Sequence, residues 1–196
     1  MPDGCPIGRG GTAPGRFAGD TLERMPTLVA DPLPAELQAL IERRRRLGQD
    51  LFDEVWEGVL HMNPGPGIPH GRIESQLTEL LGPLARAAGL FVTGQFNVGE
   101  SEQDYRVPDL GLHRPGADGV WLPTAALVVE IVSPGDDSYR KFDFYAAHGV
   151  DEVVIVDPAE RAVHWYVLAD GEYRGAERSA VIDAGAAELA KRIDWP

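Results

Sequence analysis

The chain has 196 residues, of which 43% are hydrophobic and 25% are charged, the composition of a globular protein of about one domain. No apolar run approaches the roughly 20 residues that span a bilayer, and the N-terminus lacks the apolar stretch of a secretory signal, so we expect a cytoplasmic protein with no membrane role. A single cysteine, Cys5, excludes an intramolecular disulfide and a cysteine-based zinc site.

The net charge of −13 is unevenly placed along the chain. Residues 1–50 hold seven acidic and seven basic side chains, so residues 51–196 carry the whole acidic excess. This pattern lacks the broad basic surface typical of nucleic-acid binders. The dense basic run Arg43–Arg46 would spread around most of a helix, which favours a solvated helix face over a DNA clamp.

The start of the chain is rich in Gly and Pro, and its scattered apolar residues bury too little surface to offset the entropy of ordering. We therefore predict a disordered tail at residues 1–31 and a single domain at residues 32–196. The apolar spacing predicts that the domain begins with a helix over Ala35–Leu47, which Gly48 ends.

The pattern in Leu51–Asn63 predicts a β-hairpin that turns at Glu57 and Gly58. A loop rich in Pro and Gly then brings His70 to the start of an amphipathic helix, which ends before Gly89. The apolar face of this helix consists of Ile73, Leu77, Leu80, Leu81 and Leu84.

Strand patterns dominate after Leu90. Phe91–Val98 and Tyr105–His113 favour an antiparallel pair, and Ala126–Val132 has the apolar character of a central strand. The remaining predicted elements are a helix at Asp136–His148 and strands at Glu152–Val156, Ala162–Leu168 and Glu172–Arg174, before a C-terminal segment with no clear pattern. The order helix, three strands, helix, strand indicates an α/β fold with a mixed sheet flanked by helices.

Glu130 interrupts the apolar central strand, and a buried carboxylate there needs a partner. Asp109, on the preceding strand, can reach it from a neighbouring position in the sheet. Two carboxylates that share one site favour Mg²⁺, which prefers hard oxygen ligands. The spacing leaves open an alternative, in which Glu130 forms a structural ion pair with Arg140 or Lys141.

Lys141 is one of only two lysines among 18 basic residues. Because arginine supplies positive charge elsewhere in the chain, a lysine after the Glu130 strand indicates a compact ammonium with a tunable pKa. It lies one turn before Tyr145 on the predicted helix, so its amine can fold back over the strand end and orient a water molecule.

Several motifs occur together from about Leu51 to the end of the chain. They are Trp56-Glu-Gly58-Val-Leu, His70, Val107-Pro-Asp109, Leu127-Val-Val-Glu130-Ile-Val-Ser-Pro134, Asp137, Lys141, Tyr145, Gly149-Val150, Val153-Val-Ile-Val-Asp-Pro158 and Tyr173. With these motifs the sequence resembles the Uma-two-type putative restriction endonucleases of the PD-(D/E)XK nuclease superfamily. The resemblance implies a restriction-endonuclease-like core.

The resemblance also implies roles for individual residues. Asp109 and Glu130 would bind Mg²⁺, or Mn²⁺ in its place, the Ile131 carbonyl would add a ligand, and Lys141 would position or activate the attacking water. The wider superfamily places its lysine two residues after the glutamate, where this chain has Val132. Because the resembled family supplies the lysine from the helix, we expect the site to be intact.

Two further residues have open roles. His70 matches a histidine of the resembled family and would either contact the scissile phosphate or cap its helix. Glu57 is either a third acid of the site or, as the hairpin favours, an exposed turn residue.

We therefore predict an endonuclease that hydrolyses the phosphodiester bonds of nucleic acid, DNA in the first place, with Mg²⁺ and as a homodimer. Two alternatives stay open. A catalytically retired nuclease fold that serves as a binding or assembly module would suit the acidic surface. A metal-dependent hydrolase of a small phosphorylated substrate would suit the lack of a basic groove.

Overall fold

The computed structural model describes residues 34–133 and 138–196. The predicted tail at residues 1–31 lies outside these ranges, as do Asp136 and Asp137 at the start of the third predicted helix. The described elements are α1 (Ala35–Arg46), β1 (Glu54–Trp56), β2 (Val59–His61), α2 (Ile68–Ala87), β3 (Phe91–Thr93), β4 (Asn97–Ser101), β5 (Asp104–Arg106), β6 (Leu110–His113), β7 (Trp121–Leu122), β8 (Leu127–Ile131), the 3-10 turn η1 (Ser138–Lys141), α3 (Phe142–Ala147), β9 (Glu152–Asp157), β10 (Ala162–Ala169), β11 (Glu172–Ala176) and α4 (Ala186–Arg192).

The central sheet has six strands in the order β11-β10-β9-β8-β6-β3. Its two middle strands, β8 and β9, run parallel with Glu130 beside Ile155, and the other neighbours are antiparallel. Both middle strands are buried along almost their whole length, which explains their continuous apolar sequences. The mixed sheet predicted from the sequence is therefore present.

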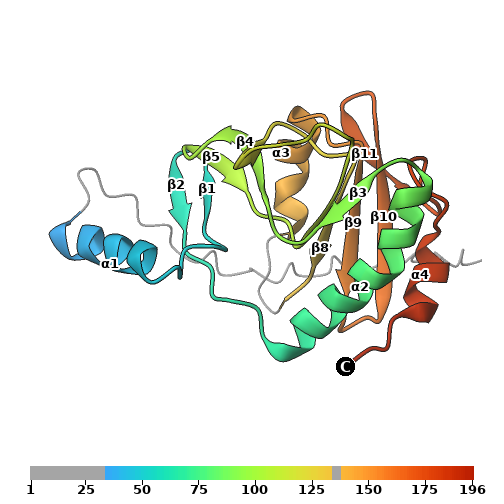
Figure 1. Ribbon diagram of the computed structural model, residues 1–196, viewed down its shortest axis with the longest axis horizontal. Helices are drawn as coiled ribbons and strands as arrows, with labels where there is room; N and C mark the ends of the chain where they lie inside the picture. The colour runs from blue at the N-terminus through green and yellow to red at the C-terminus, as the bar shows by residue number, and fades with distance from the viewer. Residues whose placement is uncertain (1–33, 134–137) are drawn as a thin grey trace, which may run out of the picture. The chain divides into compact units, whose positions relative to one another are not determined.

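Helices cover both faces of this sheet (Figure 1). On one face, α2 and α4 pack over side chains such as Leu127, Val129 and Ile131. On the other face, Val128 packs with Tyr145 of α3. Because side chains alternate along a strand, Glu130 projects to the same face as Val128, toward α3.

A second sheet has five strands in the order β2-β1-β5-β4-β7. Its first two strands form the predicted hairpin, which turns at Glu57 and Gly58 with φ angles of 50° and 82°. Two positive φ values in a two-residue loop are typical of the turns that match strand twist.

Two predicted strands are each divided between the sheets. Phe91–Val98 breaks into β3 and β4, and Tyr105–His113 breaks into β5 and β6. The chain changes sheet after Thr93, at Gly94-Gln95-Phe96, and again at Val107-Pro108-Asp109, where proline cannot donate to a strand ladder. The second crossing places Asp109 at the junction of the two sheets.

The C-terminal segment, which showed no clear pattern in the sequence, contains α4. This short helix packs against β10. Among the described residues, no helix combines the length and apolar character that crossing a membrane requires.

Candidate active site

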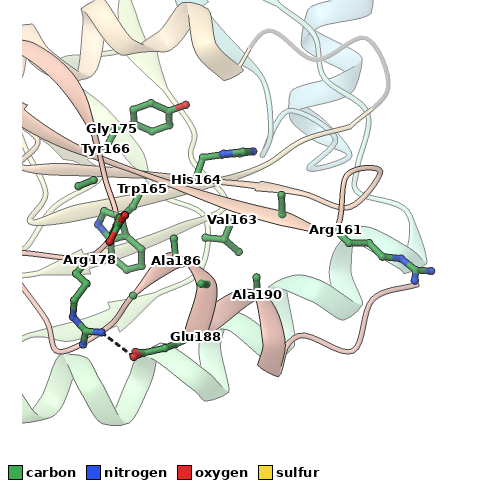
Figure 2. Close-up of a pocket in the computed structure, with 15 residues that line it drawn as sticks. Arg161, Val163, His164, Trp165, Tyr166, Gly175, Arg178, Ala186, Glu188 and Ala190 are labelled. Atoms are coloured by element: carbon green, nitrogen blue, oxygen red, sulfur yellow. Dashed lines mark hydrogen bonds and ion pairs between the residues drawn. The ribbon is translucent and has the colours of Figure 1, made fainter.

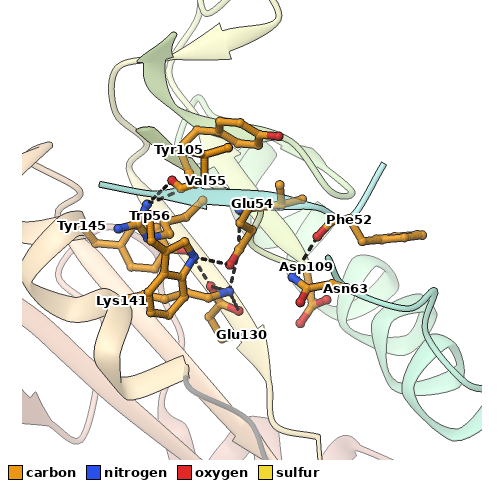
Figure 3. Close-up of polar contacts among 12 residues, drawn as sticks. Phe52, Glu54, Val55, Trp56, Asn63, Tyr105, Asp109, Glu130, Lys141 and Tyr145 are labelled. Atoms are coloured by element: carbon orange, nitrogen blue, oxygen red, sulfur yellow. Dashed lines mark hydrogen bonds and ion pairs between the residues drawn. The ribbon is translucent and has the colours of Figure 1, made fainter. Parts of the chain in front are cut away.

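Glu130 lies at the centre of a buried polar cluster at the end of β8. Its carboxylate accepts hydrogen bonds from Lys141 Nζ at 3.0 Å on each oxygen and a further bond from the Tyr145 hydroxyl (Figure 3). Burial, helped by the nearby Asp109 and Glu54, raises the pKa of Glu130 to about 8 against the opposing effect of Lys141. The structure thus contains the Lys141 ion pair that the sequence left as one alternative.

Lys141 lies between two carboxylates. Its Nζ is 2.9 Å from Glu54 Oε1 and 3.0 Å from Glu130 Oε2, and only 10% of its side chain is exposed. Burial by itself would lower the pKa of Lys141, but Glu130 and Glu54 outweigh that effect and raise the pKa. The side chain is therefore an ammonium that can donate hydrogen bonds.

Glu54, which the sequence reasoning missed, is fixed by three donors. It accepts from the Lys141 ammonium, from Val107 N at 2.7 Å and from Trp56 Nε1 at 2.8 Å. Its position at the start of the hairpin, one residue from the apolar Val55, was a weak signal for burial. The third acid of the cluster is therefore Glu54, whereas Glu57 lies exposed in the turn, where its N–H donates to Asp104.

Asp109 is held between β8 and α2. Its Oδ2 accepts from Ile131 N at 2.7 Å, and its Oδ1 is 2.9 Å from His70 Nε2. The other ring nitrogen of His70 lies 3.4 Å from Ser133 Oγ. Because α2 begins at Ile68 without a side-chain cap, His70 does not cap the helix.

Trp56 forms one wall of the cluster, and Arg106 holds it in place. Its guanidinium lies 4.6 Å from the centre of the Trp56 ring and 4.0 Å from that of Phe144, and it donates to Val55 O at 2.7 Å. Stacked cations of this kind stabilise aromatic positions by about 0.5–2 kcal/mol. This contact joins the hairpin to α3 across the junction.

The polar cluster opens into a cavity of about 420 Å³, which we call the site pocket. It is lined by residues in or next to β1, β2, the loop after the hairpin, α2, the β5–β6 connection, β8 and η1: Phe52, Glu54, Trp56, His61, Asn63, Pro64, Gly65, Pro66, Gly67, His70, Val107, Asp109, Glu130, Ile131, Ser133 and Lys141. Four predicted site residues, Asp109, Glu130, Lys141 and His70, therefore meet in one pocket.

The charges of the pocket fit a divalent cation. Two carboxylates, on Glu54 and Glu130, contact one ammonium, and the backbone bond from Ile131 brings the Asp109 carboxylate next to the residue after Glu130. No three His, Cys, Asp or Glu side chains in the described ranges form a ready-made metal cluster. Mg²⁺ needs only one or two carboxylates, because water and substrate oxygens complete its ligands.

A larger groove, of about 890 Å³, lies between β10, β11 and α4. Its edge carries an ion pair between Arg178 and Glu188, and its floor is formed by small and apolar residues such as Val163 and Ala190 (Figure 2). None of the predicted site residues lines it.

The chain is similar to known proteins in fold and in sequence. A solved structure described as a putative nuclease belonging to DUF820 from Anabaena variabilis is 16% identical, with a TM-score of 0.57 over 71% of this chain and 90% of that chain. This likeness shows the fold. A DrdV-DNA complex is 21% identical, but its TM-score is 0.35, over 59% of this chain and 10% of that chain. No curated protein matches.

The sequence match is more specific than the structural one. Residues 35–185 match the Uma2 family, described as Putative restriction endonuclease. This range includes both sheets up to the segment before α4 and every residue of the site pocket. The chain therefore belongs to the Uma2 putative restriction endonuclease family.

Proposed function

We propose that this protein is an Mg²⁺-dependent endonuclease that hydrolyses phosphodiester bonds of DNA. The observation that carries the proposal is the meeting of Asp109, Glu130 and Lys141 in one pocket, although they come from three separate elements. Family membership supports nuclease chemistry, and the acidic donor set supports a hard divalent ion.

Asp109 and Glu130 would hold the metal, with the Ile131 carbonyl as a third oxygen. A bound Mg²⁺ supplies a Lewis acid that polarises the phosphoryl oxygen and lowers the pKa of water. The ammonium of Lys141 donates hydrogen bonds, and these would orient the attacking water or stabilise charge on the phosphoryl oxygens. Its two ion pairs keep it protonated, so its role is to orient water rather than to remove a proton.

Positioning residues surround these groups. Glu54 holds Lys141 from the hairpin, and Tyr145 donates to Glu130 from α3. His70 holds Asp109 from α2, with Ser133 on the other side of its ring. Partners of this kind typically change metal affinity or activity by about 10- to 100-fold when they are removed.

A catalytically retired binding module is a second candidate. Its support is that both oxygens of Glu130 already accept bonds from Lys141, as in a structural ion pair. Glu130 Oε1 also accepts from Tyr145, but Oε2 keeps a second acceptor site, so the ion pair leaves room for a metal. The two candidates differ in whether the protein cleaves DNA.

The test is a cleavage assay on supercoiled plasmid, on single-stranded DNA and on a small phosphodiester, with Mg²⁺, with Mn²⁺ and with a chelator. We expect metal-dependent cutting of DNA that the chelator stops, and no cutting by Asp109→Ala. Binding of DNA without cutting in any metal would support the retired module. Turnover of only the small phosphodiester would replace DNA as the substrate.

The assembly state belongs to the same proposal. A double-strand cut is easily made by two active sites, and a two-fold dimer is the commonest assembly that supplies them. We expect sedimentation to give the mass of a dimer of the 21.3 kDa chain when DNA is bound. A monomer that only nicks duplex DNA would contradict the dimer and leave the chemistry in place.

A further inference from the structure

The helix α1 is unusual because none of its residues is buried. Most helices are held to a domain by a buried apolar face, but in α1 the apolar Leu37 and Ile41 are only half-buried, and Arg44 bonds the helix to the domain. Arg44 forms two bonds with Asp53, from Nη2 to Oδ1 at 2.5 Å and from Nε to Oδ2 at 3.1 Å. The Asp53 side chain is only 5% exposed, so this forked ion pair is a strong attachment.

The same arginine places the end of α1 beside the site pocket. Arg44 Nη2 also donates to Asn63 O at 3.3 Å, and Asn63 lines the pocket. Asp53 immediately precedes Glu54, which contacts the catalytic ammonium. Figure 1 shows α1 next to the β1–β2 hairpin. The last turn of α1 is therefore fixed near the pocket opening.

Three other arginines share that last turn. Arg43, Arg45 and Arg46 are exposed, and no hydrogen bond or ion pair joins their side chains to the rest of the described chain. We call these three residues the arginine patch. Residues 51–196 hold 24 acidic and 11 basic side chains, so the patch is a concentration of positive charge beside an acidic domain.

We infer that the arginine patch binds the phosphate backbone of duplex DNA next to the site pocket, an inference that rests on the proposed nuclease function. An acidic domain repels DNA, so a basic surface near the pocket would be needed to hold the strand there. The sequence favoured a solvated helix face because four arginines spread around a helix. The structure assigns Arg44 to attachment and leaves three arginines in one exposed turn.

The inference predicts a salt-dependent contact. Each phosphate that a cationic side chain neutralises contributes a slope of about −0.9 to the plot of log affinity against log salt concentration. Arg43→Gln, Arg45→Gln and Arg46→Gln together should make that slope shallower by about 2 to 3 and weaken binding at least about tenfold. The matched lysine variant keeps the charges and should stay within about threefold of wild type.

The chain offers a control with equal charge loss. Arg86, Arg114 and Arg174 are exposed and lie at the other end of the central sheet, at the end of α2, after β6 and opposite the start of β9. The ion pairs of Arg114 and Arg174 are exposed and contribute little to stability. The triple glutamine variant at these positions should bind DNA as wild type does.

The experiment measures the anisotropy of a fluorescein-labelled 30-base-pair duplex with each variant in Ca²⁺ over a range of salt, with a gel to verify intact probe and a melting curve to verify folding. A single change, Arg44→Gln, should also weaken binding, because it releases the patch from the pocket. Wild-type cleavage of the same duplex in Mg²⁺ is measured in parallel.

Three outcomes are decisive. Weaker binding and a shallower slope in the patch variant, but not in the control variant, support the inference. Equal curves for the patch and control variants overturn it, and they leave the nuclease proposal intact if the wild type still cuts the duplex. A wild-type protein that neither binds nor cuts the duplex overturns both.

Discussion

Two buried glutamates, Glu130 and Glu152, lie on the neighbouring parallel strands β8 and β9 and have different hydrogen-bond partners. Glu130 of β8 is 3% exposed and Glu152 of β9 is 0% exposed. Glu152 accepts only from neutral donors: Trp165 Nε1 at 2.8 Å, Ser179 Oγ at 2.6 Å and the N–H groups of Ala180 and Val181 at 2.5 and 3.2 Å. Its partners join the C-terminal segment to the sheet.

Glu130 has different surroundings. Its partners are the ammonium of Lys141 and a tyrosine hydroxyl, and two further carboxylates lie close to it. Neutral donors fill both acceptor sites on each Glu152 oxygen, so this carboxylate has none left for a metal ion. A reactive acid shares its site with like charges, which a cation can relieve. The residues around a buried acid, rather than its burial, therefore distinguish a candidate metal ligand from a structural acid.

The largest effect should come from Glu130→Gln. We expect cleavage to fall by more than about 10³-fold, because the change removes a metal ligand and the carboxylate partner of Lys141. Burial raises the pKa of Glu130, so the fold gains little from its charge, and Glu54 still balances Lys141 in the variant; the melting temperature should therefore change little. Single-turnover cleavage and a melting curve measure the two. A variant that cuts near the wild-type rate would make Glu130 a structural residue.

The matched change Glu152→Gln should reverse this result. Its amide cannot accept from all four donors, so we expect a loss of about 3 kcal/mol in the free energy of unfolding. For a chain of this size that is a fall of roughly 6–12 °C in melting temperature. Cleavage well below the melting point should remain within about twofold of wild type. A large loss of cleavage in folded Glu152→Gln would contradict a purely structural role for Glu152.

The variant Lys141→Arg tests whether Lys141 orients water or only balances the charge of its two carboxylates. Arginine keeps the positive charge but carries a wider planar fork. Since Lys141 Nζ lies about equally near Glu54 and Glu130, the fork cannot keep both contacts without shifting the attacking water. We expect a rate loss of about 10²-fold at saturating Mg²⁺, with metal affinity nearly unchanged. An active arginine variant would make Lys141 only a counter-ion.

Local patterns predicted much of the fold from the sequence. The hairpin turn at Glu57 and Gly58, the apolar face of α2 and the two buried strands β8 and β9 all depend on residues close together in the chain. The acid in the β8 strand was visible for the same reason, because a single charge interrupts an apolar run.

Features that depend on distant contacts were not predictable in this way. Glu54 is buried because its hairpin lies against Val107, 53 residues later in the chain. Which sheet each half of the two divided strands joins is set by its pairing with strands distant in the chain, such as β5 with β1 and β6 with β8. The short helix α4 lacks a strong apolar period and is stabilised by its contact with β10.

The smallest expected effect is on the pH dependence of stability and comes from a third buried group, His113, which burial keeps neutral. His113 of β6 is 1% exposed, its Nε2 lies 2.9 Å from Thr93 Oγ1 and its Nδ1 has no partner among the described residues. Burial lowers the pKa of His113 below its ordinary value near 6.5.

A histidine that stays neutral when folded makes stability depend on pH. The unfolded chain takes up a proton below pH of about 6.5, whereas folded His113 does not, so the stabilisation is complete above that pH and is lost as the pH falls below it. We expect the wild-type melting temperature to fall more steeply from pH 7.5 to 5.5 than that of His113→Gln, which cannot titrate. The raised pKa of Glu130 affects both proteins in the opposite direction and cancels in the difference. If the melting temperatures of the two proteins fall equally with pH, the prediction is wrong. His113 would then be protonated in the folded state, and a buried site without a carboxylate would hold a cation.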